Sequence, residues 1–187
     1  FDYLQSPDCV ILNNTKVVPA NLKCSLENTR EANILVLEKI DDSTARCLVN
    51  PARKFKKGAK IFFDNKISAE VIEDFPEKVL KFSLPVDALL DAQGRMPLPP
   101  YIKREPDEKD FAGYQTVYAK TIGAIAAPTA GLHFTNKILG DISEKGVDIE
   151  YVTLHVGYGT FRPVKSEDIR EHKMDKEYFE IENKVIE

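Results

Sequence analysis

The spacing of hydrophobic positions divides the chain into two patterns. Between Leu22 and Met96, short β-rich runs recur about every 8–12 residues, which is typical of a small β-barrel or β-sandwich. The predicted strands cover residues 34–40, 44–49, 60–63, 67–72 and 79–84. Prolines at positions 97, 99 and 100 stiffen the chain and end strand pairing, so this stretch predicts a boundary.

From Tyr101 onward the pattern is strand, loop, helix and strand. Aromatic and β-branched residues at 114–120 predict a strand, and Pro128 prevents its continuation as a central strand. A loop at 129–134 then leads into a helix with Thr135 as its N-cap. The apolar stripe of this helix comprises Ile138, Leu139 and Ile142.

A further strand is predicted where residues 147–155 alternate, after Gly146 as the residue that ends the helix. An α/β domain follows from this order of elements. Because a hydrophobic strand at 9–12 leads through a loop into the β-rich module, that module is predicted to be an insertion. The expected fold class is mixed (α+β/α/β), with a discontinuous α/β domain at 1–21 and 97–187 and an inserted all-β domain at 22–96.

Composition places the chain among globular proteins, since 43% of its 187 residues are hydrophobic and 30% are charged. It contains no run of about 18 apolar residues and does not open like a signal peptide, so membrane insertion and secretion are disfavoured and a cytoplasmic protein is expected. The cysteines are odd in number and widely spaced, which favours a reduced protein, and no zinc signature joins the histidines, so no metal site is expected. These residues are Cys9, Cys24, Cys47, His133, His155 and His172.

Charge is unevenly placed. The net charge of −4 argues against a generally cationic nucleic-acid surface. Residues 53–60 nevertheless hold five basic side chains and Phe55, which suits phosphate contact and base stacking. The other interpretation is a solvated hairpin end. The predicted RNA contacts are Arg53, Lys54, Lys56 and Lys57.

Several motifs in a fixed order carry a resemblance. Residues 114–134 read YQTVYAKTIGAIAAPTAGLHF, and further motifs lie at 13–20, 50–58, 96–102, 152–164 and 172–174. Together they resemble the S-adenosylmethionine:tRNA ribosyltransferase-isomerase family of queuosine biosynthesis. The resemblance implies an α/β-barrel-like domain interrupted by a β-barrel domain. It also implies that family members extend beyond this chain on both sides.

The activity implied by the resemblance is transfer of the ribosyl part of S-adenosylmethionine to 7-aminomethyl-7-deazaguanine in tRNA. The products are epoxyqueuosine, adenine and methionine. S-adenosylmethionine is then a co-substrate, no prosthetic group is expected, and tRNA is the partner of a monomeric enzyme. Because the sulfonium acidifies the C5′ protons, the reaction needs a base that titrates near neutral pH.

His133 is the first candidate for this base, because it lies at the loop–helix junction, where free amide groups favour an anion. The alternative is a structural histidine bonded to the loop backbone. His155 is the second candidate, since Gly157 and Gly159 follow it and let backbone approach a ligand. Its alternative is a tight turn with the imidazole packed beside Tyr151.

Other predicted substrate contacts follow strands or border the 129–134 loop. Asn14, Thr15 and Lys16 come after the first strand, where α/β enzymes often present ligand groups. The family prefers Asp and Arg at the first and third of these positions, so Asn14 supplies no carboxylate and Lys16 only a point charge. The remaining predicted contacts are Gln115, Tyr118, Thr129, Gly131 and Thr135, with strand packing as the alternative for Tyr118.

Two other function classes compete with this enzyme. A non-catalytic RNA-binding β-barrel on an α/β scaffold would need only the basic surface at 53–60. An S-adenosylmethionine-dependent methyltransferase is disfavoured, because no glycine-rich loop follows an early strand.

Overall fold

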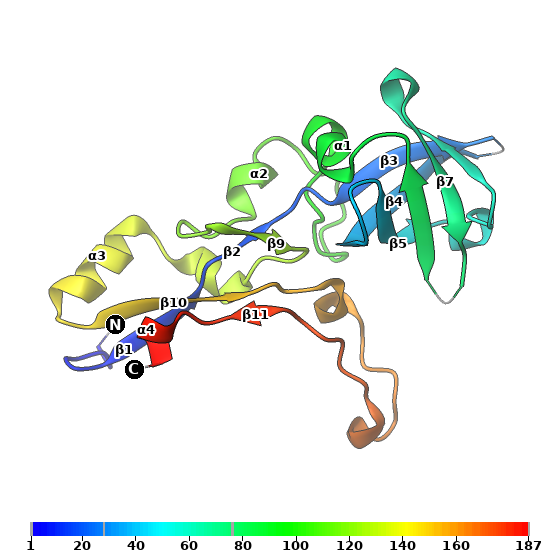
Figure 1. Ribbon diagram of the computed structural model, residues 1–187. Coiled ribbons are helices and arrows are strands. Elements are labelled where there is room, and N and C mark those ends of the chain that lie inside the picture. The colour runs from blue at the N-terminus through cyan, green and yellow to red at the C-terminus, as the bar shows by residue number, and fades with distance from the viewer. Residues whose placement is uncertain (1, 28, 76, 187) are drawn as a thin grey trace. The chain divides into compact units, whose positions relative to one another are not determined.

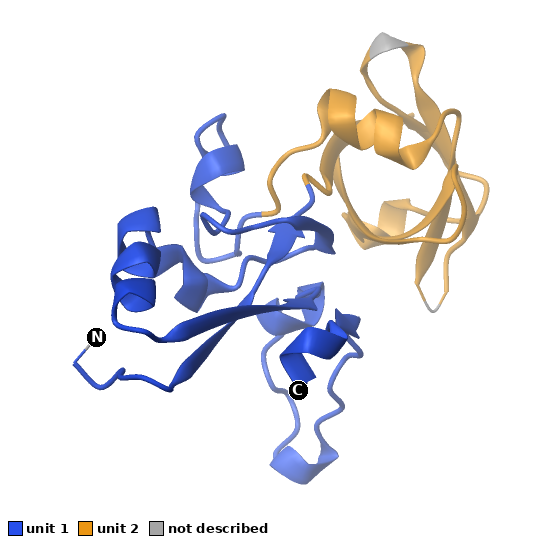
Figure 2. Cartoon of the chain, turned by 60° about the vertical axis from the view of Figure 1, so that its left-hand side comes forward, with its two compact units in different colours: residues 1–18, 98–187 blue, residues 19–97 orange. Residues whose placement is uncertain are grey.

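The computed structural model describes residues 2–27, 29–75 and 77–186 (Figure 1). It divides into two compact units, which are coloured separately in Figure 2. Unit 1 comprises Phe1–Val18 and Leu98–Glu187, and unit 2 comprises Pro19–Pro97. The predicted outer limits at residues 1 and 187 lie outside the described residues. That 22–96 forms a domain inserted between 1–21 and 97–187 stays a prediction.

Unit 2 contains a closed six-stranded antiparallel barrel in the order β3-β4-β5-β8-β7-β6, so of the two predicted all-β architectures it is the barrel that forms. Its strands are β3 (Asn21–Leu26), β4 (Thr29–Lys39), β5 (Thr44–Asn50), β6 (Lys60–Phe62), β7 (Ser68–Glu73) and β8 (Lys78–Phe82). Five of these strands were predicted and are confirmed. β3 was not predicted, although its hydrophobic residues alternate and face the core.

The barrel core is apolar. Side chains with no exposed surface include Leu22, Ile34, Phe55, Ile61, Val71 and Leu80. Helix α1 (Val86–Gln93), which was not predicted, buries Val86, Leu89 and Leu90 at helical spacing. Two short 3₁₀ helices complete the unit, η1 (Ala52–Lys54) and η2 (Asp64–Lys66).

Unit 1 is built on two small sheets with parallel pairs. β1 (Cys9–Asn13) pairs in parallel with β10 (Asp148–Leu154), and β11 (Phe179–Glu180) pairs antiparallel with β10. β2 (Thr15–Val17) pairs in parallel with β9 (Thr121–Ala124). Because these sheets have three and two strands, the α/β-barrel-like closure implied by the resemblance is not confirmed.

The helices of unit 1 are short. They are α2 (Asp110–Gly113), α3 (Asn136–Glu144) and α4 (Asn183–Ile186), with 3₁₀ helices η3 (Thr129–His133), η4 (Tyr158–Phe161) and η5 (Ile169–Glu171). The predicted N-cap of α3 is confirmed, since Thr135 Oγ1 accepts from Ile138 N at 3.2 Å. Gly146 follows the helix with φ +74°, the left-handed conformation expected of a glycine at this place.

The strand predicted at 114–120 is wrong, because the strand in this region begins only at Thr121. Here the side-chain amide of Gln115, rather than the backbone of a strand, pairs with the backbone of β2. Val17 N donates to Gln115 Oε1, and Gln115 Nε2 donates to Val17 O, both at 2.9 Å. The predicted loop at 129–134 is likewise mostly the 3₁₀ helix η3.

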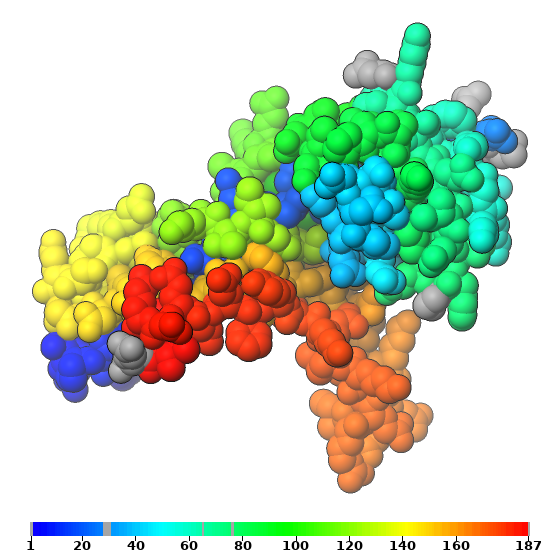
Figure 3. All heavy atoms as spheres, in the orientation of Figure 1, coloured from blue at the N-terminus to red at the C-terminus, as the bar shows by residue number. Residues whose placement is uncertain are grey.

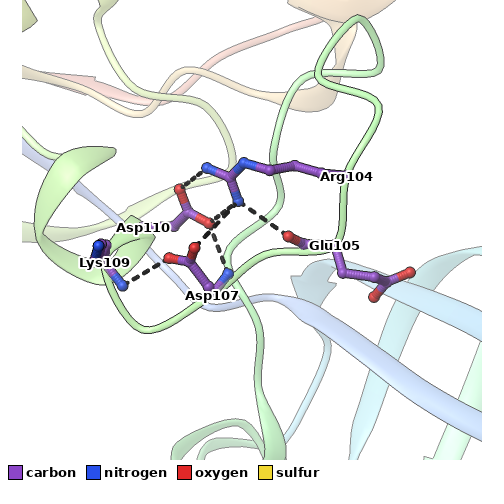
Figure 4. A network of polar contacts seen from close by, with 5 residues as sticks. All are labelled: Arg104, Glu105, Asp107, Lys109 and Asp110. Carbon is purple, nitrogen blue, oxygen red and sulfur yellow. Dashed lines mark hydrogen bonds and ion pairs between the residues drawn. The ribbon is translucent and has the colours of Figure 1, made fainter.

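A polar network fixes the segment that enters α2 (Figure 4). Arg104 donates from Nη1 to Asp110 Oδ2 at 2.7 Å and from Nη2 to Oδ1 at 2.6 Å. Asp107 N adds a third donor to Asp110 Oδ2 at 2.8 Å. The Arg104 hydrogen bonds, followed by that of the Asp107 amide, lower the pKa of Asp110 to about 2.

Candidate active site

The closest polar contact between two predicted site residues joins Thr15 and His155. Thr15 Oγ1 lies 2.7 Å from His155 Nδ1, although 140 positions separate the two residues. Thr15 is completely buried on β2, and His155 directly follows β10. The ring of Tyr178 stacks on the imidazole at 5.4 Å between centroids, and His155 N donates to Tyr178 O at 2.9 Å. Three contacts therefore fix the position and plane of this imidazole.

Gly123 makes room for the other edge of the imidazole. A Cβ atom added to Gly123 would lie 2.4 Å from His155 Nε2, so any larger residue here would displace the imidazole. The sequence did not indicate that His155 would be the neighbour of this glycine. Tyr178 was also missed, because nothing in the pattern of residues places it beside His155.

A network of asparagine and threonine side chains joins the strand ends around Thr15. Asn13 Oδ1 accepts from Thr15 N at 3.1 Å and from Leu154 N at 3.0 Å, while Asn13 Nδ2 donates to Leu154 O at 2.9 Å. Thr153 Oγ1 donates to Asn14 Oδ1 at 2.8 Å. The side-chain oxygen of Asn14 therefore accepts a hydrogen bond from the protein itself. The hydrogen bonds of Asn13 hold the backbone in the position that directs Thr15 toward His155.

Tyr118 and Gly131 form a second contact among the predicted site residues. A Cβ on Gly131 would lie 2.3 Å from Tyr118 Oη, so this glycine permits the hydroxyl to approach. The Tyr118 ring packs edge-on against Phe134 at 6.2 Å and is tilted against Tyr151 at 5.8 Å. Burial, followed by the nearby Tyr151, raises the pKa of Tyr118. Tyr118 is therefore partly buried by aromatic packing, although it lies outside any strand, and its contact with substrate stays a prediction.

Two buried hydroxyls lie on the segment that carries Tyr118. Tyr114 Oη and Thr116 Oγ1 have no hydrogen-bond partner within the described ranges, and their residues are 6% and 5% exposed. Burial raises the pKa of Tyr114. Such groups normally find a protein or water partner.

The other predicted contacts are not joined to His155 by any interaction in the described part of the chain. His133, the first candidate base, is exposed at the end of η3, and Lys16 and Thr129 are also exposed. The polar groups of Gln115 and Thr135 bind the Val17 backbone and the α3 amide described above.

The turn after His155 is held by acidic side chains that the sequence did not indicate. Gly157 N donates to Glu177 Oε1 at 2.8 Å. A Cβ on Gly159 would meet Asp175 Oδ2 at 2.4 Å, and the same Asp175 oxygen pairs with Arg162 Nη1 at 3.1 Å. Gly159 therefore permits the close approach of a carboxylate, whereas Gly157 binds one through its backbone amide.

The predicted RNA-contacting side chains of unit 2 are exposed on and after η1. No ion pair involves Arg53, Lys54, Lys56 or Lys57 among the residues that the structure describes. The aromatic part of the prediction is wrong. Phe55 is 0% exposed and belongs to the barrel core, so it is not available for base stacking.

Within residues 2–27, 29–75 and 77–186, no helix is long and apolar enough to cross a membrane. In the same ranges, no three His, Cys, Asp or Glu side chains gather where they could hold a metal ion.

Comparison with known proteins assigns the chain to a family. The model of the queuosine biosynthesis protein family matches residues 1–187. S-adenosylmethionine:tRNA ribosyltransferase-isomerases from Clostridioides difficile (48% identical) and a Sulfurihydrogenibium species (46%) align with 95% and 100% of the chain and with 53% and 56% of their own lengths. The chain thus spans about half the length of these curated relatives.

Among solved structures, an S-adenosylmethionine tRNA ribosyltransferase from Thermotoga maritima is 28% identical, with a TM-score of 0.38, over 83% of this chain and 43% of that one. The family match over the whole sequence and the two curated relatives carry the assignment. On their evidence, the chain belongs to the queuosine biosynthesis protein family.

Proposed function

We propose that this chain forms part of an S-adenosylmethionine:tRNA ribosyltransferase-isomerase. The enzyme transfers the ribosyl moiety of S-adenosylmethionine to 7-aminomethyl-7-deazaguanine in tRNA, and epoxyqueuosine, adenine and methionine are the products. The proposal includes a cytoplasmic monomer. It also includes an α/β-barrel-like domain to which the sheets of unit 1 contribute.

The observation that carries the proposal is the oriented imidazole of His155. When Nδ1–H donates to Thr15 Oγ1, 2.7 Å away, Nε2 keeps its lone pair and can remove a proton. In the proposed reaction that proton leaves C5′, which the sulfonium acidifies. Adenine then departs and takes up a proton. The aminomethyl nitrogen bonds to the ribosyl group and loses a proton, and the C5′–S bond breaks to release methionine as the epoxide closes. Tyr178 and Gly123 hold the ring on its face and at its Nε2 edge.

His155 is therefore a better-supported base than His133. A general base needs an orienting partner, and His155 has one, whereas no hydrogen bond orients the exposed His133 within the described residues. Lys16 and Thr129 keep exposed side chains for substrate contact. Gln115, Thr135 and Asn14 act instead as positioning residues, because their polar groups already bind the protein.

The test uses a chimaera in which this chain replaces the matching part of the Clostridioides difficile relative. It is supplied with tRNA containing 7-aminomethyl-7-deazaguanine and with S-adenosylmethionine labelled in either the ribose or the methyl group. Ribose label should enter the tRNA. Transfer of methyl label instead would identify a methyltransferase and refute the proposal.

Three variants of the chimaera test the assignment of the base. His155→Gln should lower single-turnover transfer by about 10²–10⁴-fold, the usual contribution of a general base. Thr15→Val removes one orienting hydrogen bond, and we expect kcat to fall roughly tenfold with little change in KM. His133→Gln serves as the matched control. If it costs more than His155→Gln, the two roles are exchanged.

A second candidate function is a non-catalytic RNA-binding barrel. It is favoured by four exposed basic side chains that form no ion pair within the described residues, Arg53, Lys54, Lys56 and Lys57. Replacing all four with Gln should weaken tRNA binding and reduce its salt dependence. Under the enzymatic proposal this variant raises KM for tRNA. If neither label is transferred while the basic surface still governs tRNA affinity, the binding function replaces the enzyme.

A further inference from the structure

A cavity of about 640 Å³ lies in the segment between β10 and β11. In Figure 1 the chain leaves β10, passes through η4 and η5, and returns beside β10 as β11. The space-filling view shows this segment, in orange, at the molecular surface (Figure 3). The volume falls within the range of about 300–1,000 Å³ found for ligand pockets.

The wall of the cavity carries a surplus of positive charge. Three basic residues, Arg162, Lys165 and Lys173, line it together with one acidic residue, Glu171. Arg162 is paired with Asp175 at 3.1 Å, whereas the two lysines form no ion pair in the part of the chain that the structure describes. Lining that carries two such ammonium groups and one carboxylate favours an anionic ligand.

Aromatic rings supply a second kind of contact. Tyr158 and Phe161 line the cavity with their centroids 5.8 Å apart and their planes at 71°. The Arg162 guanidinium lies over the Tyr158 ring at 5.8 Å. Both aromatic residues are half-buried, so part of each ring remains available. Aromatic rings and arginine planes are the surfaces on which unpaired RNA bases stack.

An unpartnered hydroxyl completes the cavity wall. Ser166 Oγ is buried and has no hydrogen-bond partner within the described ranges. The serine lies between the aromatic residues and the second lysine in the sequence and lines the same cavity. A phosphate or sugar oxygen would supply the partner that this hydroxyl lacks.

We infer that this cavity binds one nucleotide of single-stranded RNA. Its phosphate lies against Lys165 and Lys173, and its base stacks on Tyr158 and Phe161. The inference rests on the proposed function in taking tRNA as the macromolecular substrate. S-adenosylmethionine fits less well, because its sulfonium and ammonium groups would face the unpaired lysines.

The charge contacts are tested with the double variant Lys165→Gln/Lys173→Gln. The probe is an unmodified tRNA transcript, and fluorescence anisotropy gives its Kd as a function of salt. Loss of the contacts to this one single-strand phosphate should lower the slope of log K against log salt by about 0.7. Lys165→Arg/Lys173→Arg should retain the slope. The control Lys103→Gln/Lys137→Gln removes the same charge from exposed positions outside the cavity and should change the slope less.

The stacking contacts are tested with Tyr158→Leu and Phe161→Leu. Each should weaken binding of the transcript by about 5- to 100-fold while leaving the salt slope unchanged. Ser166→Ala should weaken it about threefold. Far-UV circular dichroism checks the fold of each variant. Because both lysines are exposed, their double variant tests the inference even if a leucine variant does not fold.

Equal losses in the cavity and control lysine variants would overturn the inference. So would unchanged RNA affinity in the cavity lysine variant, and a loss of S-adenosylmethionine binding with RNA binding intact would assign the cavity to that molecule instead. These binding measurements do not require turnover. The nucleotide site can therefore be refuted while ribosyl transfer is confirmed, and ribosyl transfer can be refuted while the nucleotide site is confirmed.

Discussion

Removing the charge of Asp110 should destabilise unit 1 near neutral pH, and the effect should disappear in acid. Asp110 is 7% exposed and accepts two hydrogen bonds from Arg104 and one from the Asp107 amide. Asp110→Asn keeps the size of the side chain but removes its charge. The expected loss is therefore that of charge-assisted hydrogen bonds rather than of packing.

The pKa of Asp110 sets the size and the sign of this effect. The fall from 3.8 to about 2 corresponds to roughly 2.4 kcal/mol at about 1.36 kcal/mol per pKa unit. Because the Arg104 side chain is 50% exposed, solvent screening reduces the expected loss to about 1.5 kcal/mol. Since the folded pKa is depressed, the stabilisation is present above pH 3.8 and is lost as pH falls from 3.8 to about 2.

Urea unfolding, followed by far-UV circular dichroism at several pH values, measures this difference. The difference in unfolding free energy between the wild-type and Asp110→Asn chains should be largest near neutral pH and should disappear in acid. Asp168→Asn is a matched control, because the side chain of Arg170 binds Asp168 through two nitrogens but is 87% exposed, and the change should have no measurable effect. The reasoning would be refuted if this difference did not depend on pH, or if Asp168→Asn destabilised the chain by as much.

Three further predictions follow from packing and burial. Gln115→Ala should destabilise the chain by about 2–4 kcal/mol in urea unfolding, because it leaves the N–H and C=O of Val17 without partners. Gly123→Ala should abolish transfer by displacing the His155 ring, whereas Gly140→Ala, with no atom near the added Cβ, should retain activity and stabilise α3 by about 0.5–1 kcal/mol. A thiol reagent near neutral pH should label Cys9 but neither buried cysteine, because burial raises the pKa of Cys24 to about 12 and also raises that of Cys47.

The barrel strands could be predicted because each one alternates between a packed core and solvent. The same alternation is present in β3, from Asn21 to Leu26, but the polar residues of this strand make its hydrophobic pattern less clear. The N-cap of α3 could also be predicted, because capping depends only on neighbouring residues and the sequence shows a threonine just before an apolar stripe. These features depend on neighbours within a few residues, which the sequence displays directly.

The strand predicted at 114–120 failed for a reason that is not local. Tyr114 and Thr116 are buried by side-chain packing, and Gln115 binds Val17 through its amide. A short run of aromatic and β-branched residues fits this arrangement as well as it fits a strand. Only the position of β2, nearly one hundred residues earlier, distinguishes the two, as the 98-residue separation of this contact shows.

The geometry around His155 depends in the same way on the register of the parallel pair β1 and β10. Asn13 lies opposite Val152, so both strands end at the same edge of the sheet, with Thr15 and His155 immediately beyond it. A slip of one residue would turn alternate side chains to the opposite face and separate these two. The hydrogen bonds of Asn13 to Thr15 and Leu154 act against such a slip. The imidazole is therefore positioned by the pairing of distant strands, which explains why the sequence alone ranked the locally more conspicuous His133 above it.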